Sequence, residues 1–95
     1  MHYRITRLKH SEENQSRVKA YLESVTDEIE SIDGLFRITL INVSKTETLG
    51  LSHYESEEKM VNAHTVQQKV LSGATELLSG APEGENGDVS WEWYR

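Results

Sequence analysis

Apolar and polar residues alternate along Leu35 to Glu55, a pattern that predicts a β-hairpin. From Phe36 to Leu40 every second residue is apolar, and successive side chains of a strand point to opposite faces. A polar run from Ser44 to Glu47 interrupts the alternation, which resumes at Leu49. Because this connection is too short for a crossover, the two arms can only pair antiparallel.

Two further stretches predict strands at the ends of the chain. His2 to Lys9 alternates imperfectly and carries basic residues, which is typical of a partly exposed strand. Val89 to Arg95 places Val89 and both tryptophans on one face. Ser79 to Asp88 is predicted to be a loop, because it holds the only proline and three of the six glycines.

Two helices are predicted between these strands. The first begins at the N-cap Ser11, and its apolar residues recur at steps of 3 and 4 from Val18 to Ile32. It ends before Gly34, where a left-handed C-cap glycine is expected. The second begins at the N-cap Ser56 and is weakest at Thr65 to Gln67, where it could kink or split.

The resulting order of strand, helix, strand, strand, helix, strand is typical of the ferredoxin-like α+β fold. Right-handed crossovers then place both helices on one face of an antiparallel sheet of four strands. We expect Phe36, Ile38 and Leu40 to face the helices, which leaves Ile41 and Val43 on the open face. A broad, partly apolar face is unfavourable in water, so a second copy of the chain is expected to cover it through a two-fold axis.

Composition narrows the range of partners. The 95 residues, numbered 1–95, are expected to form a single domain. A net charge of -6 without a basic cluster disfavours nucleic acids and anionic membranes, because phosphate contacts need Lys and Arg. The absence of cysteine fits a cytoplasmic location. No apolar run is long enough for a membrane span, and the first residues are unlike a signal peptide.

Two motifs resemble a known family. Ile32 to Phe36, IDGLF, looks like the entry into the second strand of the dimeric α/β-barrel superfamily, within its antibiotic biosynthesis monooxygenase-like group. Tyr54 to Glu58, YESEE, looks like the exit from the third strand, with Tyr54 in place of the commoner Trp. The resemblance implies a homodimer whose two sheets pack into a shared barrel, with a cavity between the sheet and the helices of each subunit.

The resemblance also suggests an activity. Members of the family include cofactor-independent oxygenases that act on polycyclic aromatic substrates, so we expect a monooxygenase-like oxidoreductase for a small aromatic or quinol-type substrate, with no cofactor. The haem-degrading members pair an Asn and a Trp with a His late in the second helix. Because no histidine follows His64, haem is disfavoured.

Three residues are candidates for catalysis. His53, on the third strand, and His64, on the second helix, could accept a proton near neutral pH if both face the space between sheet and helices. The simpler alternative is that His53 closes the core and His64 faces solvent. Tyr54 is the third candidate. No metal site is expected, because two histidines without a carboxylate are too few and no HExxH spacing is present.

Four residues are candidates for substrate binding: Arg37, Asn42, Trp91 and Trp93. If Val43 pairs with Thr48, Arg37 lies opposite Tyr54, where the two side chains could orient an oxygenated substrate or simply stack on each other. The tryptophans could line a pocket for a flat ligand, or else belong to the core or a dimer interface.

Two alternatives to an enzyme remain. The first is a homodimer that binds a small organic ligand, or regulates, without catalysis. The second is a monomeric ferredoxin-like module that binds nucleic acid on its open sheet. The net charge of -6 and the lack of a basic, aromatic sheet face argue against the second alternative.

Overall fold

The computed structural model describes residues 1–95, and its elements follow the predicted order. The strands are β1 (His2–Lys9), β2 (Leu35–Ser44), β3 (Glu47–Tyr54) and β4 (Glu83–Asp88). The helices are α1 (Gln15–Ser24), α2 (Thr26–Glu30), α3 (Glu57–Asn62), α4 (His64–Gly73) and the short 3₁₀ helix η1 (Thr75–Leu77). All neighbouring strands pair antiparallel in the order β2-β3-β1-β4. The ferredoxin-like α+β fold is therefore confirmed.

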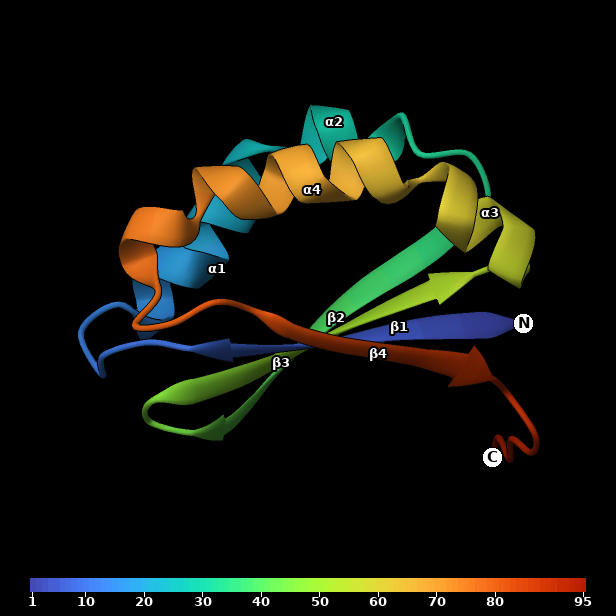
Figure 1. Ribbon diagram of the computed structural model, residues 1–95. Coiled ribbons are helices and arrows are strands. Elements are labelled where there is room, and N and C mark those ends of the chain that lie inside the picture. Colours follow the sequence, from blue (N-terminus) through green and yellow to red (C-terminus); the bar gives the residue numbers. More distant parts are fainter.

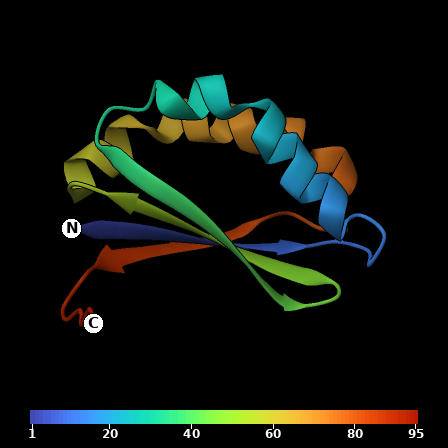
Figure 2. The same ribbon diagram turned by 180° about the vertical axis from the view of Figure 1, so that it is seen from behind.

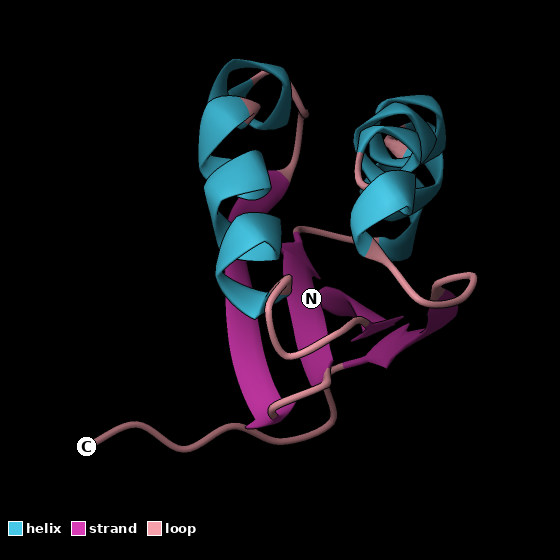
Figure 3. Cartoon of the chain, turned by 90° about the vertical axis from the view of Figure 1, so that its left-hand side faces the viewer, coloured by secondary structure: helices cyan, strands magenta, loops and turns pink.

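The helices form one layer and the sheet another (Figure 1). All helices lie over the same face of the sheet, and the opposite face carries none, as the view from behind also shows (Figure 2). Seen along the layers, the α1–α2 and α3–α4 arms stand side by side above the strands, and the C-terminal tail runs away from them (Figure 3). None of the helices combines the length and apolar character needed to cross a bilayer.

The register of the hairpin differs from the hypothesis by one residue. Thr48 pairs with Asn42 rather than Val43, and Arg37 lies opposite His53 rather than Tyr54. The irregularity next to the turn, between 42 and 44, accounts for this difference, and a second irregularity lies between 35 and 37 at the other end of β2. Each adds one residue to β2, and an extra residue in one strand shifts the pairing beyond it, which no alternation of side chains reveals.

The irregularity between 35 and 37 changes the position of Phe36. Ile38 and Leu40 face the helices as expected. Phe36 instead lies with its ring edge against His53, and it is 55% exposed. Ile41 and Val43 are also exposed, so the helix-free face of the sheet carries uncovered apolar side chains.

The predicted first helix is divided into α1 and α2 at Val25 and begins later than expected. Ser11 accepts a hydrogen bond from the Asn14 N–H at 3.2 Å, so it caps a turn, and α1 starts at Gln15. At the break, the Ser24 hydroxyl donates to a backbone carbonyl three residues earlier. Thr26 does the same, and such side-chain bonds compete with the helical pattern.

The predicted second helix is divided as well. Its N-cap is confirmed, because Ser56 Oγ accepts a hydrogen bond from the Lys59 N–H at 3.2 Å. The division falls at Ala63, two residues before the stretch predicted to be weak. Ala63 packs with Met60 and Tyr54 in a small buried cluster.

The prediction for the last strand is wrong. β4 lies within Ser79 to Asp88, the predicted loop, and Val89 to Arg95 forms no regular element. The partner strand β1 begins at His2, which pairs with Asp88, and beyond this pair the Val89 N–H donates one further backbone hydrogen bond to the Met1 carbonyl at 3.0 Å. Backbone groups alone make the β1–β4 ladder, and polar residues and glycines supply them as well as apolar residues do.

Candidate functional site

An apolar cavity of about 70 Å³ lies between the sheet and the helices. Its helical wall consists of Val18, Tyr21, Leu22, Ile29, Ile32, Gln67, Val70, Leu71 and Ala74, and its sheet wall of Thr6, Leu8, Ile38, Leu40, Gly50, Ser52 and Tyr54. The predicted apolar stripes of both helices thus meet the sheet here. A cavity of roughly 150 Å³ holds a benzene ring, so a ligand of ring size needs more space than this cavity alone.

A more polar hollow of about 180 Å³ adjoins the cavity. The two hollows share Thr6, Gln67 and Leu71 as lining residues. The polar hollow adds Arg4 from β1 and Asn86 from β4. A molecule with an apolar ring and one oxygenated end would therefore find matching surroundings along this path.

Arg4 is the cationic group where the two hollows meet. Its Nη1 donates to Gln67 Oε1 and its Nη2 to the carbonyl of Met60, both at 3.2 Å. Its Nε is buried and has no hydrogen-bond partner. The Nε–H of this charged guanidinium is thus unpaired and can donate to an oxygen atom of another molecule.

Tyr54 places a phenol near Arg4, on the wall of the apolar cavity. It is 1% exposed and lines the cavity from β3. Burial raises the pKa of Tyr54 above its ordinary value of 10.0, and the positive charge of Arg4 partly opposes this shift. The phenol therefore stays protonated near neutral pH and can donate a hydrogen bond.

A second phenol ties the helical wall together. The Tyr21 hydroxyl donates to the carbonyl of Val70 at 2.6 Å, which joins α1 to α4 over the cavity. Burial raises the pKa of Tyr21, so this donor also keeps its proton.

The three residues predicted for catalysis do not lie together. Tyr54 lines the cavity. His53 is 7% exposed but lies on the helix-free face, where its ring stacks on Tyr3 with the ring centres 4.5 Å apart. His53 Nε2 is buried without a hydrogen-bond partner. His64 is the first residue of α4 and is exposed.

The residues predicted for substrate binding lie outside the cavity. Arg37 is exposed and donates to the Tyr3 hydroxyl at 3.0 Å; it does not stack on Tyr54, which is on the other face. Asn42 is exposed and accepts a hydrogen bond from Thr48. Trp91 and Trp93 are 78% and 62% exposed on the tail.

Sequence reasoning missed the contribution of β1. Along this strand, His2, Thr6 and Leu8 are buried and Arg4 is half-buried, on the face that meets the helices. Tyr3 and Ile5, which carry the apolar pattern, point the other way. The period of two separates these sets, but polar side chains normally face solvent, so the pattern alone does not predict that His2, Arg4 and Thr6 meet the helices.

His10 was missed as well. It is 2% exposed, and its ring nitrogens lie 2.8 Å from the Ser11 carbonyl and 2.8 Å from Thr48 Oγ1. Thr48 in turn donates to Asn42. This chain of hydrogen bonds fixes the end of the sheet at the opposite end from Tyr54.

No family model matches the chain, and no curated protein matches it. Several solved structures match the chain. A monooxygenase from the gene ActVA-Orf6 of Streptomyces coelicolor, solved with the ligand nanaomycin D, has a TM-score of 0.83 at 14% identity, over 99% of this chain and 91% of that one.

Two other similar structures belong to the same fold. A dimeric ferredoxin-like protein from an uncultured marine organism gives a TM-score of 0.80 at 16% identity, over 99% of this chain and 91% of that one. A candidate antibiotic biosynthesis monooxygenase from Deinococcus radiodurans gives 0.75 at 13% identity, over 100% and 98%. At these identities the likeness concerns the fold, and the chain accordingly has the ferredoxin-like fold of the antibiotic biosynthesis monooxygenase-like proteins.

Proposed function

We propose that this chain forms a homodimer that oxygenates a small aromatic or quinol-type substrate, without a cofactor, between its sheet and its helices. The observation that carries the proposal is the placement of Tyr54 in a mostly apolar cavity and of Arg4 in the polar hollow that adjoins it. In an anthrone-type substrate a ring CH₂ group and O₂ give a ring carbonyl and water. In a quinol-type substrate a ring C–H and O₂ give a ring C–OH and water, while the quinol itself becomes a quinone. The substrate supplies the electrons, so the protein has to bind it, exclude water and stabilise its anion.

Each part of the proposed site has a physical role. The apolar walls exclude water, which strengthens every electrostatic interaction inside. The free Nε–H of Arg4 and the phenol of Tyr54 are donors for the oxygen that becomes negative when the substrate loses a proton. Tyr54 thus keeps its predicted role in this proposal. His53 and His64 have none, because neither lines the cavity.

The interface of the proposed dimer is the helix-free face of the sheet. Phe36, Ile41 and Val43 are between 41% and 55% exposed there. Uncovered apolar patches of this kind mark interaction surfaces. The tail with Trp91 and Trp93 leaves the sheet on the side without helices (Figure 3), where it would lie against a second copy. A similar solved structure is described as dimeric, and the cysteine-free sequence favours the cytoplasm.

The experiment is a measurement of O₂ consumption with a panel of anthrones and naphthohydroquinones, without added metal or cofactor. Gly50→Val is the decisive variant, because Gly50 lines the cavity and a Cβ there meets only ordinary contacts, Leu40 Cδ2 at 3.7 Å and the Thr6 carbonyl at 3.9 Å. The added side chain should fill the cavity and abolish turnover while the protein stays folded. Gly87→Val, on β4 outside the cavity, is the matched control.

A second candidate function is ligand binding without catalysis, by a sensor or regulatory homodimer. One observation favours it: no carboxylate or imidazole lines the apolar cavity, and the polar hollow offers only the carboxylate of Glu85 to remove a proton from the substrate. Under this alternative the same compounds bind the wild type and fail to bind Gly50→Val in calorimetry, but no O₂ is consumed. Absence of both binding and turnover over the whole panel contradicts both functions.

A further inference from the structure

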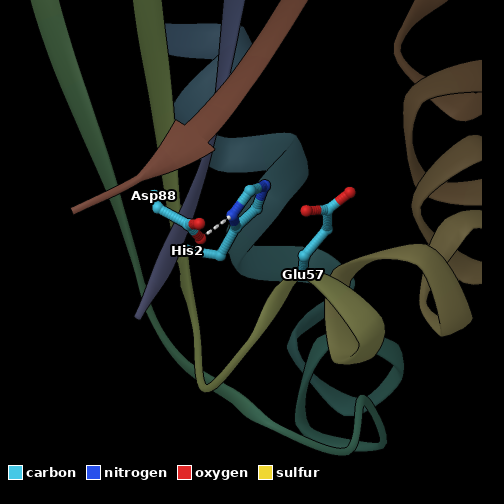
Figure 4. A group of neighbouring side chains, drawn as sticks. All are labelled: His2, Glu57 and Asp88. Atoms are coloured by element: carbon cyan, nitrogen blue, oxygen red, sulfur yellow. Dashed lines mark hydrogen bonds and ion pairs between the residues drawn. The ribbon is translucent and has the colours of Figure 1, made fainter.

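We propose that His2, Glu57 and Asp88 form a binding site for a divalent transition-metal ion of the Zn²⁺ class, separate from the cavity. One ligand atom of each residue lies within 4.8 Å of those of the other two. The residues come from β1, the first turn of α3 and the end of β4. In Figure 4 the imidazole of His2 lies between the two carboxylates.

The imidazole is already oriented as a metal ligand requires. His2 is 2% exposed, and its Nδ1 lies 2.6 Å from Asp88 Oδ1. Metal-binding histidines generally donate one ring N–H to a carboxylate, which fixes the tautomer and turns the other nitrogen toward the metal. Here that arrangement makes Nε2 the metal ligand and Asp88 the carboxylate that holds the ring.

The Nε2 of His2 is hydrogen-bonded to Asn86 Oδ1 at 2.9 Å. A bound ion would replace this hydrogen bond, and Asn86 Oδ1 would then be a neighbouring oxygen ligand. The carboxylate of Glu57 is on the side of the ring that faces away from Asp88 (Figure 4). Glu57 is exposed, so its side chain can move the remaining distance and water can complete the coordination.

Charge favours a cation at this point. Asp88 contacts the His2 ring, which is neutral when it binds a metal, and neither Asp88 nor Glu57 pairs with any lysine or arginine. A set of one imidazole and several oxygen atoms suits Zn²⁺ and similar borderline ions better than Ca²⁺ or Mg²⁺, which prefer oxygen ligands alone.

The site departs from the expectation that no metal binds. That expectation considered only His53 and His64, two histidines without a carboxylate to complete a metal site. His2 and Asp88 are 86 positions apart, and only the pairing of β1 with β4 brings them together. A bound ion would link these two strands to α3, and this binding energy would add to the stability of the fold.

The test uses the full chain without an affinity tag, dialysed against EDTA and titrated with ZnCl₂ in a calorimeter. We expect one Zn²⁺ per chain and a higher melting temperature with the ion. Glu57→Gln should weaken binding by at least about tenfold, and Asp88→Asn by about 10- to 100-fold, as for other residues that orient a metal ligand. Glu58→Gln, an exposed neighbour with the same change of charge, is the matched control and should bind Zn²⁺ normally.

Two results would overturn the proposal. The first is no saturable Zn²⁺ binding by the wild type at micromolar concentration. The second is equal affinity in the wild type and Glu57→Gln. Because Glu57 is exposed, this variant should fold normally even if replacement of the buried His2 disturbs the strand pairing. Neither result depends on whether the cavity binds a substrate.

Discussion

The hydroxyl of Tyr21 occupies the space that a side chain on Gly73 would need. A Cβ on Gly73 would lie 2.1 Å from Tyr21 Oη and 2.8 Å from Tyr21 Cζ. The same hydroxyl donates to the Val70 carbonyl at 2.6 Å, one turn earlier in α4. Glycine in a helix usually lowers the free energy of unfolding by about 1 kcal/mol relative to alanine. At Gly73 the missing side chain permits the close contact between α1 and α4.

Gly73→Ala should therefore destabilise the protein, although helix propensity alone predicts the opposite. We expect the free energy of unfolding to fall by about 1–3 kcal/mol, the usual range for overpacking. Urea denaturation measures it. In a Tyr21→Ala background the same substitution should become neutral or stabilising, because the obstacle is gone. An equal effect in both backgrounds would show that the contact is irrelevant.

Ile41→Glu tests the proposed dimer. Ile41 is 41% exposed on the helix-free face, and a charge buried there between two subunits without a partner would cost several kcal/mol. Sedimentation velocity should show a dimer for the wild type and a monomer for this variant. Val61→Glu is the control, because Val61 is 57% exposed on α3, in the helical layer, and this variant should remain dimeric. A monomeric wild type at high concentration rules the dimer out.

The stability of the protein should decrease in alkaline solution because of Tyr54. Burial raises its pKa in the folded protein above the ordinary 10.0, so the folded state holds the phenolic proton more tightly than the unfolded state does. The stability that this proton confers is fully present below pH 10 and is lost as the pH rises through the folded value. Tyr54→Phe removes this dependence.

The measurement is urea denaturation of both proteins at several pH values from 8 to 11. Above pH 10 the wild type should lose up to about 1.4 kcal/mol per pH unit more than Tyr54→Phe. The comparison isolates Tyr54, since Tyr21 contributes a similar dependence to both proteins. Parallel curves would mean that Tyr54 titrates alike in the folded and unfolded states.

Gly34→Ala should destabilise the connection between α2 and β2. Gly34 has a φ of 81°, where other residues cost about 1–2 kcal/mol. A Cβ there would also lie 2.6 Å from Lys59 Cγ, and Lys59 forms an ion pair with Asp33. We expect a loss of at least about 1 kcal/mol in thermal or urea unfolding. Gly80→Ala, with nothing within 4 Å, serves as the reference.

The sequence predicted the fold well because its strongest patterns reflect burial. The stripe from Val18 to Ile32 does line the space above the sheet, and Gly34 does adopt the left-handed conformation. The predictions were wrong where the backbone geometry, rather than burial, determines the local structure. The extra residues in β2 and the helix break at Val25 arise from local hydrogen bonding that hydrophobic periodicity does not record.

The candidate site was much less predictable than the fold. Arg4 lies near Tyr54 because β1 pairs with β3 and directs its polar residues toward the helices. The local pattern of apolar and polar residues predicts neither the pairing nor this direction. His53 illustrates the opposite case. A histidine at the end of an apolar alternation suggests chemistry, but its ring serves as a stacking partner for Tyr3. Long-range pairing and the choice of face decide which polar groups meet.

The strand β4 also bears on how the chain behaves at high concentration. Its sequence, EGENGD, is short, acidic and exposed along its whole length, and it forms one border of the sheet. The other border, β2, is irregular at both ends. Edge strands of this kind repel an incoming strand by their charge or pair with it poorly. Natural sheets avoid growing into fibrils in this way. Both edges of the sheet thereby disfavour open-ended polymerisation of the chain by strand addition.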